Sequence, residues 1–159
     1  MLMELLRYDG FDIVMQEVPD EITLAINVTE CPYHCVGCHS PHLWGSYGAY
    51  LGEDLAEIVQ RYDGMITCVC FMGGDHHIED LARQCRYIKT FYPHLKIAVY
   101  SGADNFKPLR SIMPILDYVK IGPYIQGRGG LDNPNTNQRL YKRYGVSWSD
   151  ITYRFWRDI

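Results

Sequence analysis

Blocks of apolar periodicity alternate along the first three quarters of the chain. Four short runs of β-branched and apolar residues predict strands: 22–27, 65–72, 95–100 and 117–121. Three segments with apolar residues at helical spacing predict helices: 52–62, 78–91 and 108–116. Strands that alternate with helices favour βαβ units and an α/β fold with a mostly parallel sheet. Four or so strands are too few for a closed eightfold barrel, so we expect an open sheet or a partial (βα) barrel.

The pattern changes after Gly122. Residues 122–137 contain four Gly, two Pro and three Asn, which predicts a loop. Its glycines do not match the G-x-G-x-x-G fingerprint of a dinucleotide site. The tail from residue 138 is aromatic and basic, and we expect a short helix around Arg139–Tyr144. We therefore predict one domain over 1–159, with 123–159 as a C-terminal loop and a basic aromatic tail.

Composition narrows the class of protein. The chain has 159 residues and a mass of 18.4 kDa, with 47% hydrophobic and 21% charged residues, which is typical of one folded domain and excludes disorder. No apolar run approaches the ~20 residues that span a bilayer. Charged residues occur early, at Glu4, Arg7 and Asp9, unlike a signal peptide. We expect a cytoplasmic protein that binds neither a membrane nor a nucleic acid.

Charge is distributed unevenly. The net charge is −4, but residues 120–159 hold seven Lys/Arg against three Asp, a balance of +4, and the remainder has −8. Either this basic quarter meets an acidic partner surface, or it is an ordinary solvated face.

Three of the six cysteines form a compact motif. Cys31, Cys35 and Cys38 have the spacing C-x3-C-x2-C, whereas Cys68, Cys70 and Cys85 lie in apolar segments and are expected in the core. Thiolates suit iron–sulfur clusters, zinc or copper(I). Three cysteines on a four-iron cube leave one iron open for a ligand, since four cysteines are the ordinary set. The alternatives are structural or redox thiols, or a zinc site completed by one of three nearby histidines: His34, His39 or His42.

This motif, placed directly after the first predicted strand, resembles the radical S-adenosylmethionine superfamily. The stretch 31–44, with Gly37 before the last Cys, resembles the activating proteins of anaerobic (class III) ribonucleotide reductases. The resemblance covers about 22–144. It implies that Cys31, Cys35 and Cys38 hold a [4Fe-4S] cluster, and that the sheet has the radical S-adenosylmethionine topology.

Further stretches support the resemblance. Gly73-Gly74-Asp75 stands where the superfamily has a Gly-Gly-Glu-like motif, and Ser101 stands in a stretch similar to its Tyr-Thr-Gly. Glycines allow close approach of the backbone, while a carbonyl and a carboxylate can hold an ammonium group. We therefore expect Gly73, Gly74, Asp75 and Ser101 to bind S-adenosylmethionine. The other interpretations are Asp75 as a helix N-cap and Ser101 in a simple turn.

Two more positions bear on the resemblance. Residues 135–139 are similar to the family's small-Ser-Asn-Gln-Arg stretch, although they also suit a helix start capped by Asn135 or Thr136. The family's acid in the last predicted strand is replaced by Ile121, with Lys120 before it. Lys120 either meets the cofactor's carboxylate or lies on the surface, and its role stays open.

The resemblance implies an enzyme. It would be an activase that reductively cleaves S-adenosylmethionine and generates a glycyl radical on anaerobic ribonucleoside-triphosphate reductase, with an external electron donor such as flavodoxin or ferredoxin. No protein side chain is assigned as catalytic, because the cofactors carry the chemistry. The alternatives are an activase of another glycyl radical enzyme, a small-molecule radical enzyme, or a non-catalytic zinc-binding interaction module. Docking candidates are the 122–137 loop and four aromatic residues of the tail: Trp148, Tyr153, Phe155 and Trp156.

Overall fold

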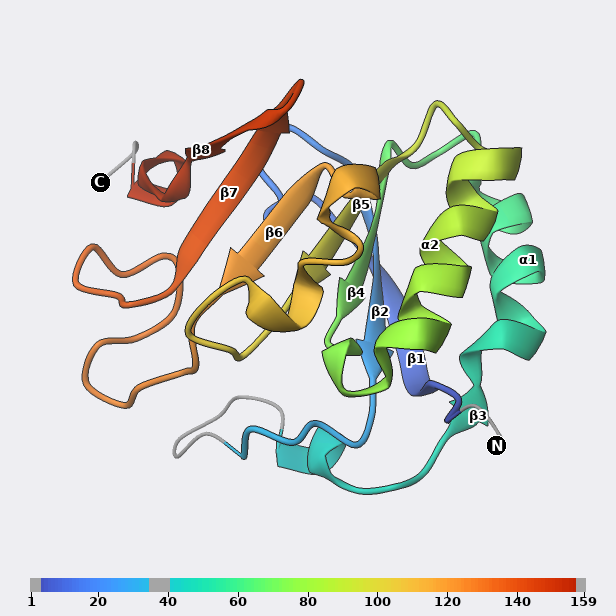
Figure 1. Ribbon diagram of the computed structural model, residues 1–159, viewed down its shortest axis with the longest axis horizontal. Coiled ribbons are helices and arrows are strands. Elements are labelled where there is room, and N and C mark those ends of the chain that lie inside the picture. The colour runs from blue at the N-terminus through green and yellow to red at the C-terminus, as the bar shows by residue number, and fades with distance from the viewer. Residues whose placement is uncertain (1–3, 35–40, 157–159) are drawn as a thin grey trace.

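The computed structural model describes residues 4–34 and 41–156, and its two α-helices lie together on one side of a single twisted sheet (Figure 1). Within those residues the sheet has eight strands: β1 (Arg7–Val14), β2 (Thr23–Val28), β3 (Ala49–Tyr50), β4 (Cys68–Met72), β5 (Lys96–Tyr100), β6 (Tyr118–Ile121), β7 (Arg139–Tyr144) and β8 (Ser147–Asp150). Two α-helices accompany them: α1 (Leu51–Tyr62) and α2 (Ile78–Phe91). Five short 3₁₀ helices complete the described elements: Pro41–Trp44, Asp75–His77, Lys107–Leu109, Met113–Ile115 and Thr152–Trp156.

The sheet is mixed. Its order is β3-β1-β2-β4-β5-β6-β7-β8, and the central strands β2, β4, β5 and β6 are parallel to one another. The flanking strands are antiparallel to their neighbours. The expected parallel arrangement thus describes the middle of the sheet, and antiparallel strands that the pattern did not predict extend both edges. Whether this sheet is of the radical S-adenosylmethionine type stays a prediction.

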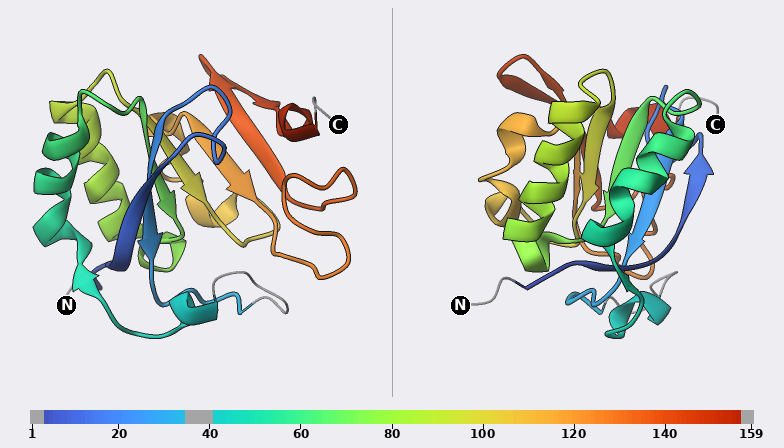
Figure 2. Two further views of the ribbon diagram at one scale, coloured as in Figure 1. Left: turned by 180° about the vertical axis from the view of Figure 1, so that it is seen from behind. Right: turned by 90° about the vertical axis from the view of Figure 1, so that its right-hand side faces the viewer.

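Side-chain alternation on the central strands builds two cores. Val69, Phe71 and Val99 face α1 and α2, which cover one face of the sheet (Figure 2). Cys68, Cys70, Ala98, Tyr100 and Tyr118 face the other side, where they pack with Val18 and with Ile151 near the C-terminus. Burial on both faces explains why 65–72 appears as one continuous apolar run. The expectation that Cys68, Cys70 and Cys85 are core residues is confirmed, since all three are fully buried.

The expected helix over 108–116 is wrong. Two separate 3₁₀ turns, Lys107–Leu109 and Met113–Ile115, stand there instead. Pro114 falls in the interior of the expected helix, where proline lacks the N–H donor and clashes with the preceding turn. The apolar positions Leu109, Ile112 and Leu116 still reach the core, so the periodicity identified the buried face without identifying the helix type.

The expected short helix around Arg139–Tyr144 is also wrong. These residues form β7, which pairs with β6 and continues through a turn at Gly145 (φ 65°) into β8. No helix begins at Asn135 or Thr136 either: these residues belong to the loop before β7. The Thr136 hydroxyl donates to the Gly129 carbonyl within that loop. Leu140 is the one fully buried residue of β7 and packs in the core on the side away from the helices, whereas Tyr141 packs against the core under the helices.

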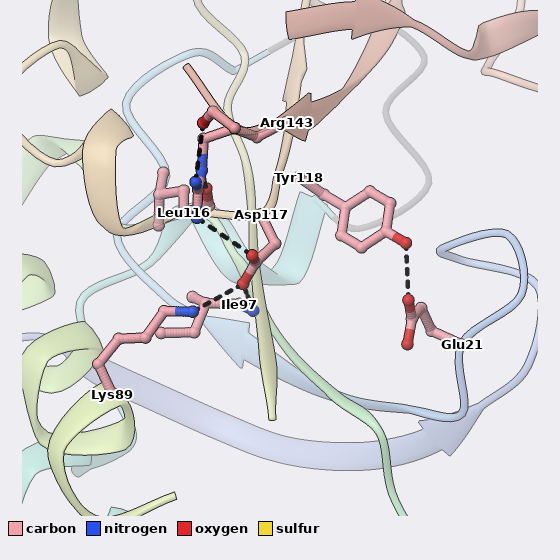
Figure 3. A network of polar contacts seen from close by, with 8 residues as sticks. Glu21, Lys89, Ile97, Leu116, Asp117, Tyr118 and Arg143 are labelled. Atoms are coloured by element: carbon pink, nitrogen blue, oxygen red, sulfur yellow. Dashed lines mark hydrogen bonds and ion pairs between the residues drawn. The ribbon is translucent and has the colours of Figure 1, made fainter. Parts of the chain in front are cut away.

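Ion pairs fix the amino end of β6. Asp117 accepts hydrogen bonds from Lys89 Nζ (2.9 Å), Ile97 N–H (2.9 Å) and Arg143 Nη2 (3.3 Å), as Figure 3 shows. The Arg143 Nε also donates to the Leu116 carbonyl (2.6 Å). One carboxylate thereby joins α2, β5 and β7.

Within the described residues, no helix is long and apolar enough to cross a bilayer.

Candidate functional site

The carboxyl ends of the four parallel strands lie in one row. The strand register pairs Asn27 with Met72, Met72 with Tyr100, and Tyr100 with Lys120. The segments that follow these residues therefore emerge at the same edge of the sheet. In parallel α/β sheets this edge is where ligands bind.

A cavity of about 1080 Å³ opens at this edge. Each of the four parallel strands sends residues into its wall, and these include most of the predicted site: Cys31, Gly73, Gly74, Asp75, Ser101 and Lys120. A volume of this size meets or exceeds that of a typical small-molecule site, roughly 300–1,000 Å³. Thus the structure brings the described part of the cysteine motif and the four predicted cofactor contacts together around one space.

The cysteine motif begins directly beyond β2. Cys31 is partly buried, and its N–H donates to the Leu43 carbonyl (3.0 Å), while the Glu30 N–H donates to the Gly45 carbonyl (3.0 Å). These two bonds join the start of the loop to its end. Cys35 and Cys38 lie outside the described residues. Two of the three alternative zinc ligands, His39 and the side chain of His42, lie outside them too.

Asp75 does not act as a helix N-cap. Its Oδ2 accepts hydrogen bonds from the Tyr33 hydroxyl (2.5 Å) and the Ser101 hydroxyl (2.7 Å). The 3₁₀ helix that starts at Asp75 has no side-chain cap. The side chain is therefore held at the cavity wall by residues of the cysteine motif and of the β5 end.

The glycines before Asp75 serve the backbone conformation. Gly73 and Gly74 have φ angles of 113° and 110°, in the region that only glycine adopts without strain. A Cβ atom on Gly74 would lie 3.4–3.6 Å from the side chains of Leu81 and Leu6, which is ordinary van der Waals contact. The left-handed turn is thus the reason for glycine here, and it directs the chain from β4 into the cavity wall.

Ser101 and Lys120 connect two strand ends. The Ser101 side chain, almost fully buried, donates to Asp75 and accepts from the Ala103 N–H (3.0 Å). Lys120 Nζ donates to the carbonyls of Ser101 and Gly122, both at 3.1 Å. Backbone carbonyls therefore hold the Lys120 ammonium at the cavity wall. The structure does not show which ligand this ammonium would meet.

Buried polar atoms around the cysteine motif fit a hydrogen-bonding group there. The Trp44 Nε1 and both ring nitrogens of His76 are buried without a hydrogen-bond partner among the described residues. Trp44 stacks on His34 inside the motif (centroids 4.7 Å apart), and His76 lines the cavity. Burial, followed by repulsion from His77, lowers the pKa of His76, which favours the neutral imidazole with one N–H donor. Unpaired donors beside soft thiol ligands suit a cluster whose sulfurs accept hydrogen bonds.

A second wall of the cavity was missed from the sequence. The segment 15–21, between β1 and β2, crosses the face of the sheet opposite α1 and α2. Two tyrosine hydroxyls hold it: Tyr100 donates to the Glu17 carbonyl, and Tyr118 donates to Glu21 Oε2 (2.6 Å; Figure 3). Arg154 pairs with Asp20 across the same wall. No motif marks this segment, because its attachment depends on partners 83 to 134 positions away.

Residues 22–143 match the family described as a 4Fe-4S single cluster domain. The chain belongs to this family. Its match covers β2, the whole cysteine motif and every strand end that lines the cavity, and it places the protein among iron–sulfur proteins with a [4Fe-4S] cluster. No curated protein matches the chain, and no solved structure matches it. The family favours the cluster over the lone zinc ion that the cysteine spacing also allowed.

Proposed function

We propose that this 4Fe-4S single cluster protein is a radical S-adenosylmethionine activase that generates a glycyl radical on an anaerobic ribonucleoside-triphosphate reductase. One observation carries the proposal: Cys31, the first residue of the cysteine motif, and Asp75 follow different strands and line the same cavity. The sequence resemblance supplies the reaction class, and the cavity supplies a place where both cofactors would meet.

Cys31, Cys35 and Cys38 would hold the cluster, leaving one iron without a protein ligand. A cluster held there, once reduced by an external donor, would supply the one electron needed for reductive cleavage of S-adenosylmethionine, the chemistry by which the activase would generate the partner's glycyl radical. The chain's own task is to bind, orient and exclude water. Trp44 and His76 would donate hydrogen bonds around the cluster.

Charge in the cavity wall suits the methionine end of the cofactor. Asp75 would accept the α-ammonium group together with the carbonyls of the glycine turn before it. Lys120 would face the carboxylate, because its ammonium is held at the same edge of the sheet, on β6. An anion after β4 and a cation on β6, with β5 between them, match a zwitterion in one orientation.

The remaining space would admit the partner. The far wall is formed by segment 15–21, by residues 130–132, and by Arg154 and Phe155. Tyr153, 52% exposed, is a suitable anchor on this side. Trp156 donates its indole N–H to the Leu131 carbonyl (2.8 Å) and Trp148 packs on the core, so these two support the fold from within.

Anaerobic reconstitution tests the proposal. We expect a brown protein with about four irons, which forms 5′-deoxyadenosine and methionine when reduced in the presence of S-adenosylmethionine. Addition of an anaerobic reductase should give a glycyl radical in the electron spin resonance spectrum. Cofactor cleavage without that signal would point to a different glycyl radical enzyme or a small substrate. A colourless protein with about one zinc would contradict the proposal and identify an interaction module.

A further inference from the structure

Tyr33 connects the cysteine motif to two strand ends. It lies between the first and second cysteines of the motif, and its hydroxyl donates to Asp75 Oδ2 (2.5 Å). Its ring covers the backbone of Gly102, where a Cβ atom would come within 2.7 Å of two ring carbons. Gly102 has no positive φ, so it is the ring, and not the turn, that excludes a larger residue.

The two hydroxyl bonds leave half of the carboxylate available. Both Tyr33 and Ser101 donate to Oδ2, and no described residue donates to Oδ1. In the described part of the chain, no lysine or arginine pairs with Asp75. A carboxylate fixed by two neutral donors keeps its negative charge for a cationic ligand, and its orientation is set in advance.

From this geometry we infer that Tyr33 is a positioning residue: it orients Asp75 for the ammonium group of S-adenosylmethionine and ties that site to the cysteine motif. The inference rests on the proposed function. Because a coupling between two sites is reciprocal, a ligand held by Asp75 also holds Tyr33, and with it the segment that starts at Cys31.

The chain contains a matched control. The Tyr8 hydroxyl donates to Asp54 Oδ2 (2.6 Å), as the Tyr33 hydroxyl does to Asp75. This pair joins β1 to α1, and neither residue lines the cavity. Removal of the Tyr8 hydroxyl therefore removes the same type of bond without touching the proposed site.

A double-mutant cycle tests the inference in reconstituted full-length protein. The variants are Tyr33→Phe, Asp75→Asn, the double variant and Tyr8→Phe. We measure iron content, S-adenosylmethionine affinity by equilibrium titration, and the electron spin resonance spectrum of the reduced cluster with and without S-adenosylmethionine. Tyr33→Phe should keep four irons but bind S-adenosylmethionine about tenfold more weakly, so the ligand-induced spectral change needs about tenfold more ligand. Tyr8→Phe should bind as the wild type does.

The double variant distinguishes positioning from a general structural role. If Tyr33 acts through Asp75, the double variant should bind no more weakly than Asp75→Asn alone. Full additivity, unchanged affinity in Tyr33→Phe, or loss of iron from that variant would overturn the inference. Gly102→Ala, which displaces the ring, should reproduce the Tyr33→Phe loss. Unchanged affinity in Asp75→Asn would instead contradict the proposed S-adenosylmethionine site itself.

Discussion

Two aspartates at opposite ends of the parallel strands have contrasting surroundings. Asp117, at the amino end of β6, is neutralised by Lys89 and Arg143 and also accepts a backbone N–H. Asp75, at the carboxyl end of β4, has only the neutral donors Tyr33 and Ser101 among the described residues. A carboxylate whose charge is satisfied within the chain stabilises the fold, whereas one that retains its charge beside a cavity is suited to a ligand.

The largest expected effect concerns the motif beside Asp75. Cys35→Ala should abolish the cluster, because a three-cysteine site has no spare ligand, and iron content should fall from about four to near zero along with the visible absorption. Cys85→Ala is the control, since this thiol is buried in the core under the helices and does not line the cavity. A Cys35→Ala protein that keeps its cluster and cleaves S-adenosylmethionine would refute the assignment.

The next largest effect concerns the free energy of unfolding, which should depend more on Asp117 than on Asp75. Asp117→Ala leaves two partly buried cations and one backbone donor without their partner, so we expect the free energy of unfolding to fall by roughly 2–4 kcal/mol. Chemical denaturation of the metal-free protein measures it. The contrast between the two ends would fail if Asp117→Ala were as stable as the wild type.

The smallest change in stability is expected at Asp75. Asp75→Ala removes a charge that no described cation neutralises, but it also takes the acceptor from the Tyr33 and Ser101 hydroxyls. The free energy of unfolding should therefore fall by about 1–2 kcal/mol, less than in Asp117→Ala. S-Adenosylmethionine affinity should fall tenfold or more while iron content is kept, as equilibrium titration would reveal. A variant that is strongly destabilised yet binds the cofactor normally would reverse the roles assigned to the two residues.

Periodicity predicted the central architecture because local burial dictates it. The α2 helix was predicted with its bounds, and β2, β4, β5 and β6 within a few residues. Antiparallel β1 was missed because its pairing shifts register between Tyr8 and Phe11, which interrupts the alternation. The identity of β7 depends on pairing with β6, a non-local contact that overrides the helical preference of a short basic segment.

The site was predictable as far as single residues carry chemistry. The cysteines, the glycine turn and Asp75 have recognisable types and spacing, and the described ones do share a cavity. Tyr33 and His76 were not assigned to the site, because a tyrosine or histidine gains its role only from neighbours distant in sequence. A polar aromatic residue inside the cysteine motif was the one signal available for Tyr33.

The backbone bonds from Cys31 to Leu43 and from Glu30 to Gly45 have a consequence for metal binding. These bonds join backbone groups of the polypeptide, so they bring the two ends of the metal-binding segment together without any metal ligand. Much of the entropy of bringing its two ends together is therefore already spent before metal arrives. Metal binding by the cysteines would therefore cost less loop-closure entropy than in a segment whose two ends were not joined.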